Sequence, residues 1–196
     1  MASSFFAMMA RMKYIERWSL MRNSNKENIS EHSMEVSMLS HGLAIIGNER
    51  CGKDYDVEKA ALYGLYHDAT EIITGDMPTP VKYFNEEIQH AYKQVESVAS
   101  EKLLDMLPGY MRKYYEPLLF PAEVGQNELY KLIKAADKLS AFIKCIEEEK
   151  AGNHEFSTAR QTTFDSLRKM NLPEVEIFIR DFLPAYSKTL DELSRN

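Results

Sequence analysis

Residues 66–82 have the sequence YHDATEIITGDMPTPVK, in which ionisable side chains precede a segment rich in glycine and proline. Toward the N-terminus, Asp56 is a suitable helix N-cap, and apolar residues follow it at helical spacing. Continued into this stretch, the same helical face carries three ionisable residues: His67, Asp68 and Glu71. The pattern therefore predicts one helix from Val57 to about Ile73, with its ionisable groups concentrated at the C-terminal end.

The segment after this helix cannot remain helical. Thr74–Pro80 contains Gly75 and two prolines, and a proline lacks the backbone N–H and clashes with the preceding helical turn. We expect a stiff, defined loop at this point. Asp76 belongs to that loop, directly after the ionisable end of the helix.

Apolar periodicity elsewhere in the chain indicates helices, and no segment shows the alternation typical of a strand. The 196 residues include only 8 Gly and 7 Pro, which are few for the tight turns of an all-β fold. We predict an all-α helical bundle of roughly seven to nine helices, forming a single domain over residues 1–196. The other predicted helices span approximately residues 4–18, 30–46, 85–107, 110–120, 128–150, 156–167 and 173–190.

Charge and composition exclude several classes of protein. The net charge of −6 repels nucleic-acid polymers, and no apolar run approaches the ~20 residues that a membrane-spanning helix needs. Cys51 and Cys145 supply neither a disulfide framework nor a thiolate metal site, which favours a reducing compartment. We expect a cytoplasmic protein that binds neither a nucleic-acid polymer nor a membrane.

Four metal-competent side chains fall on or beside the inward faces of three predicted helices: His32, His67, Asp68 and Asp137. An adjacent His-Asp pair alone is common, and a single buried histidine is usually an ordinary core residue. Burying two imidazoles and two carboxylates together is costly unless a divalent cation compensates them. The set therefore predicts a metal site, and its mixed ligands suit Mn²⁺, Co²⁺, Fe²⁺ or Zn²⁺.

The order of these four residues resembles that of the HD-domain superfamily of metal-dependent phosphohydrolases. Further strings, spread over essentially the full chain, are similar to those of bacterial HD-domain 5′-deoxynucleotidases: Arg17–Trp18, Asn28–Ser33, Tyr66–Glu71, Thr74–Lys82 and Lys134–Asp137. The resemblance implies an HD-domain helical bundle.

The activity implied by this resemblance is hydrolysis of 2′-deoxynucleoside 5′-monophosphates to the deoxynucleoside and phosphate. The implied enzyme accepts any base, discriminates against ribonucleotides, uses one divalent cation such as Co²⁺ or Mn²⁺, and forms a homodimer. The residues implied to bind the substrate are Arg17, Trp18, His32, Asp68, Asp76, Met77, Pro78, Thr79 and Asp137.

Three residues are expected to be catalytic: Arg17, Asp68 and Glu71. Arg17 offers a planar fork of donors that suits a phosphate group. Glu71 follows Asp68 by three residues, so a helix would present it beside the metal, where it can exchange a proton with water or with the leaving oxygen. The resemblance assigns the sugar 3′-OH to Asp76 and the exclusion of a 2′-OH to Trp18.

Each functional interpretation has a structural alternative. Arg17 can be a surface ion-pair partner, Trp18 a core anchor, Glu71 a solvated residue and Asp76 an Asx-turn residue. The lysines of the helix over residues 128–150 are expected to form a solvated face: Lys131, Lys134, Lys138 and Lys144.

Three other functions remain open from the sequence. Another HD hydrolase could act on deoxynucleoside triphosphates, cyclic nucleotides or alarmone nucleotides, and the metal residues alone do not separate these substrates. A non-catalytic nucleotide sensor would require a broken ligand set or a missing Glu71, and the sequence shows neither. A helical scaffold without a ligand would contain no metal.

Overall fold

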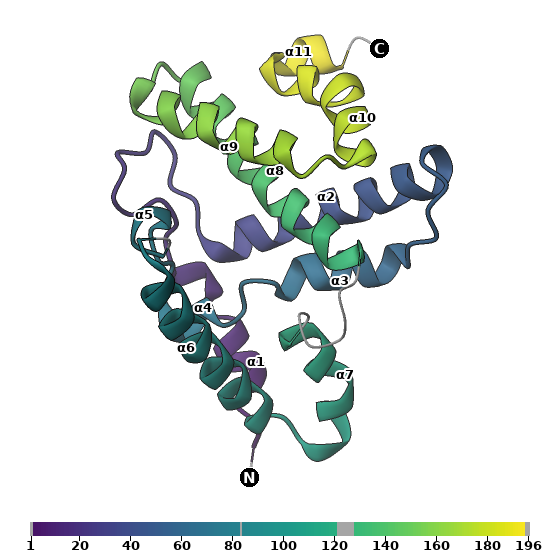
Figure 1. Cartoon of the computed structure of the whole chain (residues 1–196). Coiled ribbons are helices and arrows are strands. Elements are labelled where there is room, and N and C mark those ends of the chain that lie inside the picture. Colours follow the sequence, from purple (N-terminus) through teal and green to yellow (C-terminus); the bar gives the residue numbers. More distant parts are fainter. Residues whose placement is uncertain (1, 83, 121–127, 195–196) are drawn as a thin grey trace. The chain divides into compact units, whose positions relative to one another are not determined.

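The computed structural model describes residues 2–82, 84–120 and 128–194, and their regular structure is helical (Figure 1). In these residues we find eleven α-helices and three 3-10 helices, and the only β-type pairing is an isolated bridge between Glu16 and Asn28. The all-α prediction is confirmed, and seven of the described α-helices have nine or more residues. Among the described helices, none is both long and apolar enough to cross a membrane.

The helices have the following bounds. The α-helices are α1 Phe5–Met9, α2 Ile29–Arg50, α3 Val57–Tyr66, α4 Glu71–Thr74, α5 Thr79–Lys82, α6 Glu86–Asp105, α7 Gly109–Leu119, α8 Glu128–Lys150, α9 Ser157–Lys169, α10 Pro173–Asp181 and α11 Leu190–Leu193. The 3-10 helices are η1 Met12–Tyr14, η2 His154–Phe156 and η3 Leu183–Ser187.

The helices form two compact units. The first comprises residues 1–22, 26–34 and 65–127, and the second comprises residues 23–25, 35–64 and 128–196. Helix α2 therefore begins in the first unit and continues in the second. The single domain over residues 1–196 stays a prediction.

In the first unit, α6 packs against α4, α5 and α7. Six buried apolar side chains of this unit form one cluster: Phe5, Ala69, Leu103, Leu104, Leu107 and Leu119. Aromatic rings extend this cluster, since the Tyr115 ring lies 4.9 Å from that of Phe5 and 5.6 Å from that of Tyr66 in edge-to-face geometry. This core fixes Ala69, which lies next to Asp68 in the chain.

The first helix is much shorter than its periodicity predicts, because α1 ends at Met9 rather than near Trp18. Backbone hydrogen bonds between residues 15–17 and residues 27–29 form here instead of the helical ones. The Arg17 N–H donates to the Glu27 carbonyl at 2.9 Å, and the Ile29 N–H donates to the Ile15 carbonyl at 3.0 Å. The chain therefore turns back on itself between Ile15 and Ile29 instead of continuing as a helix.

The predicted helix over residues 57–73 is also wrong, because α3 ends at Tyr66 and α4 begins at Glu71. Asp56 caps α3 as predicted, since its carboxylate accepts the Lys59 N–H at 2.9 Å. A tight turn separates the two helices, with the Glu71 N–H donating to the Asp68 carbonyl at 3.0 Å. His67 and Asp68 lie in that turn and not on a helical face.

In the second unit, α8 runs from Glu128 to Lys150 as predicted and packs against α9. The Phe142 and Phe164 rings, one from each helix, have centroids 5.0 Å apart. The C-terminal helix begins at Pro173 as predicted, but α10 ends at Asp181, and Pro184 lies in η3. The end of the predicted helix is exposed, since Leu190 keeps 80% of its surface accessible.

Lys144 contradicts the predicted solvated face, because its side chain is buried against Glu148. Its Nζ also donates to the Asn25 carbonyl, and the Glu148 carboxylate accepts the Ser24 N–H at 2.8 Å. Burial alone raises the pKa of Glu148, but the hydrogen bonds from Lys144, Ser24 and Asn153 outweigh it and lower the pKa to about 2. The pair therefore ties residues 23–25 to α8.

Gly64 lies where α3 passes close to α2. A Cβ atom at this position would lie 2.8 Å from both the Ser37 Cα and the Val36 carbonyl oxygen, which are backbone atoms. Gly64→Ala is expected to reduce the free energy of unfolding by about 1–3 kcal/mol, because the two helices must move apart. Urea denaturation measures the free energy of unfolding of the variant. Gly42→Ala is the matched control, since a Cβ atom at that position would have no neighbouring atom within 4 Å. Equal stability of the two variants would contradict the close packing.

Candidate active site

Arg17 and Trp18 both bind the side chain of Glu27. The Arg17 Nη1 donates to Glu27 Oε1 at 3.1 Å, and the Trp18 Nε1 donates to Glu27 Oε2 at 3.0 Å. The Arg17 guanidinium lies 5.9 Å from the centre of the Trp18 ring system. Sequence reasoning missed Glu27, because its proximity to two residues about ten positions earlier depends on the backbone bridge and not on any motif.

Trp18 has an uncommon backbone conformation, with φ at +58°. A bulky side chain in this left-handed region is strained and needs support from its surroundings. Its side chain is supported by Glu27, and its backbone N–H donates to the carboxylate of Asp76. The structure thus brings together the two residues to which the resemblance assigns sugar recognition.

Two imidazoles converge on one carboxylate oxygen in the first unit. Asp68 Oδ2 lies 3.4 Å from His32 Nε2 and 3.0 Å from His67 Nε2. His32 is fully buried in the first turn of α2, which Asn28 caps by accepting the Glu31 N–H at 3.1 Å. The histidines thus reach this point from α2 and from the α3–α4 turn.

The side chains of His32, His67 and Asp68 have the donor atoms and the spacing that a divalent cation requires. One ligand atom of each lies within 4.8 Å of the others, a spacing that suits ligands placed around a single ion. Imidazole nitrogen combined with carboxylate oxygen is a donor set for first-row transition metals. Glu27 Oε1 faces the other ring nitrogen of His32, Nδ1, at 3.7 Å, as outer residues do around metal-ligating histidines.

Asp137 lies in the middle of α8, in the second unit. Its neighbours Ala135 and Ala136 are buried, and Asp137 itself is half-buried. The predicted helical position of this residue is confirmed. Its role as a fourth ligand stays a prediction.

Glu71 is buried, which excludes the solvated alternative. The residue is only 7% exposed, and its Oε2 atom has no hydrogen-bond partner among the described residues. Burial, together with the nearby charges of Asp68 and Asp76, raises the pKa of Glu71 to about 9, against opposing effects of Arg17 and Lys82. A buried carboxyl group close to Asp68 and Arg17 is suitably placed for proton transfer.

The loop after α4 positions Asp76. Gly75 ends α4 with φ at +72°, a conformation that favours glycine. The predicted loop over Thr74–Pro80 is confirmed only for residues 75–78: Thr74 is the last residue of α4, and Pro80 lies in the first turn of α5, where its missing N–H costs no helical hydrogen bond. Burial raises the pKa of Asp76, although Arg17 and the Trp18 N–H oppose this. Met77 and Pro78 are half-buried in the same loop, whereas Thr79 is exposed and begins α5.

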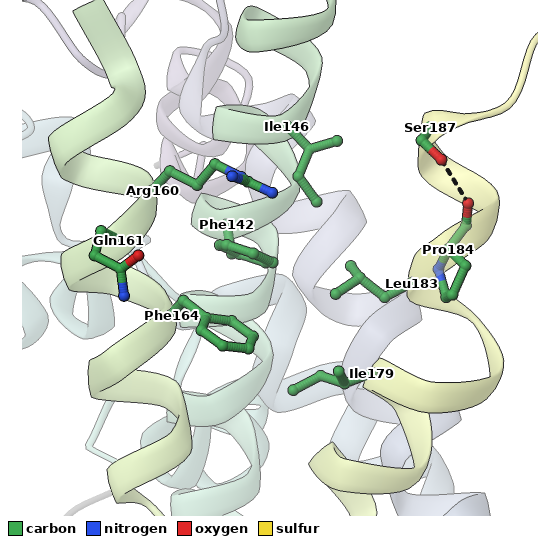
Figure 2. Close-up of a pocket in the computed structure, with 9 residues that line it drawn as sticks. All are labelled: Phe142, Ile146, Arg160, Gln161, Phe164, Ile179, Leu183, Pro184 and Ser187. Atoms are coloured by element: carbon green, nitrogen blue, oxygen red, sulfur yellow. Dashed lines mark hydrogen bonds between the residues drawn. The ribbon is translucent and has the colours of Figure 1, made fainter.

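A separate cavity of about 440 Å³ lies within the second unit, among α8, α9, α10 and η3 (Figure 2). Its walls are mainly apolar, and Phe142, Phe164 and Leu183 project into it. The Arg160 side chain at its edge pairs with Glu149 at 3.3 Å. The predicted site residues do not line this cavity.

The fold is that of the HD-domain phosphohydrolases. An HD-domain phosphohydrolase from Listeria innocua superposes with a TM-score of 0.80 at 20% sequence identity, covering 93% of this chain and 88% of its own. The HD phosphohydrolase of cyanophage S-2L, solved bound to dA and one catalytic Zn²⁺ ion, gives a TM-score of 0.66 at 20% identity, covering 93% and 96%.

Sequence comparison narrows this class. The model of the 5′-deoxynucleotidase YfbR-like family matches residues 4–186. A 5′-deoxynucleotidase of Vibrio vulnificus is 43% identical over 192 residues, 98% of each chain, and one of Vibrio cholerae is 45% identical over the same length and coverage. The chain belongs to the YfbR-like 5′-deoxynucleotidase family and is an enzyme, a phosphoric monoester hydrolase.

Proposed function

We propose that this enzyme hydrolyses 2′-deoxynucleoside 5′-monophosphates, accepts any base and discriminates against ribose. The observation that carries this proposal is the hydrogen bond from the Trp18 backbone N–H to the Asp76 carboxylate, which places these two residues side by side. Arg17 lies close enough for its charge to lower the pKa of Asp76. The names of the relatives support the deoxynucleotide substrate, and so does the dA bound to the cyanophage neighbour.

One divalent cation, such as Co²⁺ or Mn²⁺, is proposed to be held by four ligands: His32, His67, Asp68 and Asp137. When bound, it supplies a water of lowered pKa and neutralises charge on the phosphate. The three ligands of the first unit have the required donor atoms and spacing. Asp137 adds the second carboxylate in this proposal.

We assign phosphate binding to Arg17 and proton transfer to Glu71. Arg17 presents its guanidinium to the phosphate oxygens, and the ion pair with Glu27 fixes its direction. Glu71 accepts a proton from the attacking water or returns one to the leaving 5′-oxygen. Its burial excludes bulk water from this exchange.

The sugar is assigned to Trp18 and the loop after α4. Asp76 accepts a hydrogen bond from the 3′-OH, and the indole of Trp18 fills the space that a 2′-OH would need. Met77, Pro78 and Thr79 complete this side of the site. His32, Asp68 and Asp137 contact the phosphate end of the substrate as well as the metal.

The sugar preference gives the test of this function. kcat/KM for dAMP is expected to exceed that for AMP by about 10²-fold, because a ribose displaced by about 1 Å misplaces the phosphate for reaction. Phosphate release from a panel of nucleotides, with each divalent metal added in turn, measures the ratio. Trp18→Ala should reduce it toward one. Comparable kcat/KM for dAMP and AMP in the wild-type enzyme would contradict the proposal.

The same panel separates the alternative substrates. Preferential cleavage of deoxynucleoside triphosphates, cyclic nucleotides or alarmone nucleotides would place the enzyme elsewhere among the HD hydrolases. We also propose that it is a cytoplasmic homodimer, as the resemblance implies, and sedimentation equilibrium measures the oligomeric state.

A further inference from the structure

We infer that Glu27 is a positioning residue that holds the Trp18 indole and the Arg17 guanidinium in their working orientations. The inference rests on the proposed function for the roles of Trp18 and Arg17, but not for the geometry of Glu27. Glu27 is not among the site residues that the sequence predicts.

Both oxygens of the Glu27 carboxylate are engaged, each with a different donor. Oε1 accepts from Arg17 Nη1 at 3.1 Å, and Oε2 accepts from Trp18 Nε1 at 3.0 Å. The Arg17 and Glu27 side chains are only 11% and 12% exposed, so water competes little for these bonds. Hydrogen bonds to a charged acceptor are the stronger kind, and here they fix two adjacent side chains together.

Trp18 needs this support because its backbone is strained. Its φ of +58° belongs to a region that bulky residues rarely adopt. The Asp76 carboxylate holds its backbone N–H, and the Glu27 carboxylate holds its indole N–H, so the residue is fixed at both ends. Without Glu27, the indole N–H loses this charged hydrogen-bond acceptor, which weakens the restraint on the orientation of the ring.

Glu27 also faces the ligand set. Its Oε1 atom, which binds Arg17, lies 3.7 Å from Nδ1 of His32, and the opposite Nε2 atom of His32 points toward Asp68. One carboxylate therefore lies between the indole assigned to the sugar, the guanidinium assigned to the phosphate and a proposed metal ligand. A shift of the Glu27 carboxylate would therefore move the side chains assigned to the sugar and to the phosphate at the same time.

Glu27→Gln is the decisive substitution, because it removes the negative charge and replaces one of the two acceptor oxygens with an NH2 group, which would face an N–H donor instead of accepting from it. Glu16→Gln is the matched control. Glu16 lies in the same folded-back segment and pairs with Lys26 at 2.7 Å, but its side chain is 53% exposed. Both variants remove one negative charge, and only the first removes contacts to Trp18 and Arg17.

The first readout is the fluorescence of metal-free protein, in which Trp18 is the sole tryptophan. Glu27→Gln is expected to shift the emission to longer wavelength and to increase quenching by acrylamide, whereas Glu16→Gln leaves both unchanged. Circular dichroism verifies that the variants are folded. Unchanged emission and quenching in folded Glu27→Gln would overturn the inference.

The second readout is the ratio of kcat/KM for dAMP to that for AMP. Glu27→Gln is expected to lower it about tenfold, the effect of losing one hydrogen bond to a charged group, and Glu27→Asp to restore part of it. A ratio in Glu27→Gln equal to that of Glu16→Gln would overturn the inference. A wild-type enzyme without sugar preference would instead refute the proposed function, and the fluorescence readout would still test Glu27.

Discussion

Asp68→Ala is expected to abolish metal binding and phosphate release together. The Oδ2 atom of Asp68 lies 3.0 Å from one imidazole nitrogen and 3.4 Å from another, so its removal takes the shared carboxylate away from both histidines. A bound metal contributes several kcal/mol to such a reaction, and we expect turnover to fall by about 10³-fold or more.

Elemental analysis after dialysis measures the metal content of this variant. Asp137→Ala is prepared in parallel, because the proposed four-ligand site requires that it also lose metal. Asp54→Ala is the control, since Asp54 is an exposed carboxylate that belongs to no cluster of ligand-type residues in the described part of the chain. Full metal occupancy in both Asp68→Ala and Asp137→Ala would refute the assignment.

Glu71→Gln is expected to retain metal and substrate affinity but to turn over about 10²- to 10⁴-fold more slowly, as for the loss of a general acid or base. Glutamine keeps the size of the buried side chain and removes its ability to take up a proton. The expected signature is therefore a fall in kcat with KM nearly unchanged.

Single-turnover phosphate release and metal analysis of the same preparation measure this outcome. Glu58→Gln, a change of an exposed glutamate in the first turn of α3, is the control. Turnover of Glu71→Gln close to that of Glu58→Gln would remove Glu71 from the proposed mechanism.

Features that depend on neighbours in sequence were predictable. The bounds of α8 follow from apolar periodicity alone, and the predicted cap at Asp56 is a local side-chain contact to a backbone N–H three residues later. The candidate ligands were found in the same way, because His67 and Asp68 belong to a recognisable string. Their chemistry does not depend on whether a helix or a turn carries them.

Features that depend on distant contacts were missed. The periodicity after Phe5 favours a helix to Trp18, but backbone pairing with residues near Asn28 ends it early. Lys144 lies on a helical face that the pattern predicts to be solvated, but its Nζ donates to the carbonyl of Asn25, 119 residues away in sequence, and this contact is not visible in the pattern. Glu27 lies in no motif, and its role depends on the same backbone pairing that shortens the first helix.

The bridge between Glu16 and Asn28 has a consequence for the order of folding. Arg17 and Glu27 are ten positions apart, and closing a loop of about ten residues takes only roughly 10–100 ns with a small entropic cost. The guanidinium, the indole and their shared carboxylate can therefore meet in a local fluctuation. The contact of Asp76 with Trp18 closes a much longer loop, since α2 and α3 lie between them in the chain, and its entropic cost is therefore larger. Two of the nine residues proposed to contact the substrate, Arg17 and Trp18, thus lie in one short loop whose closure requires no packed core.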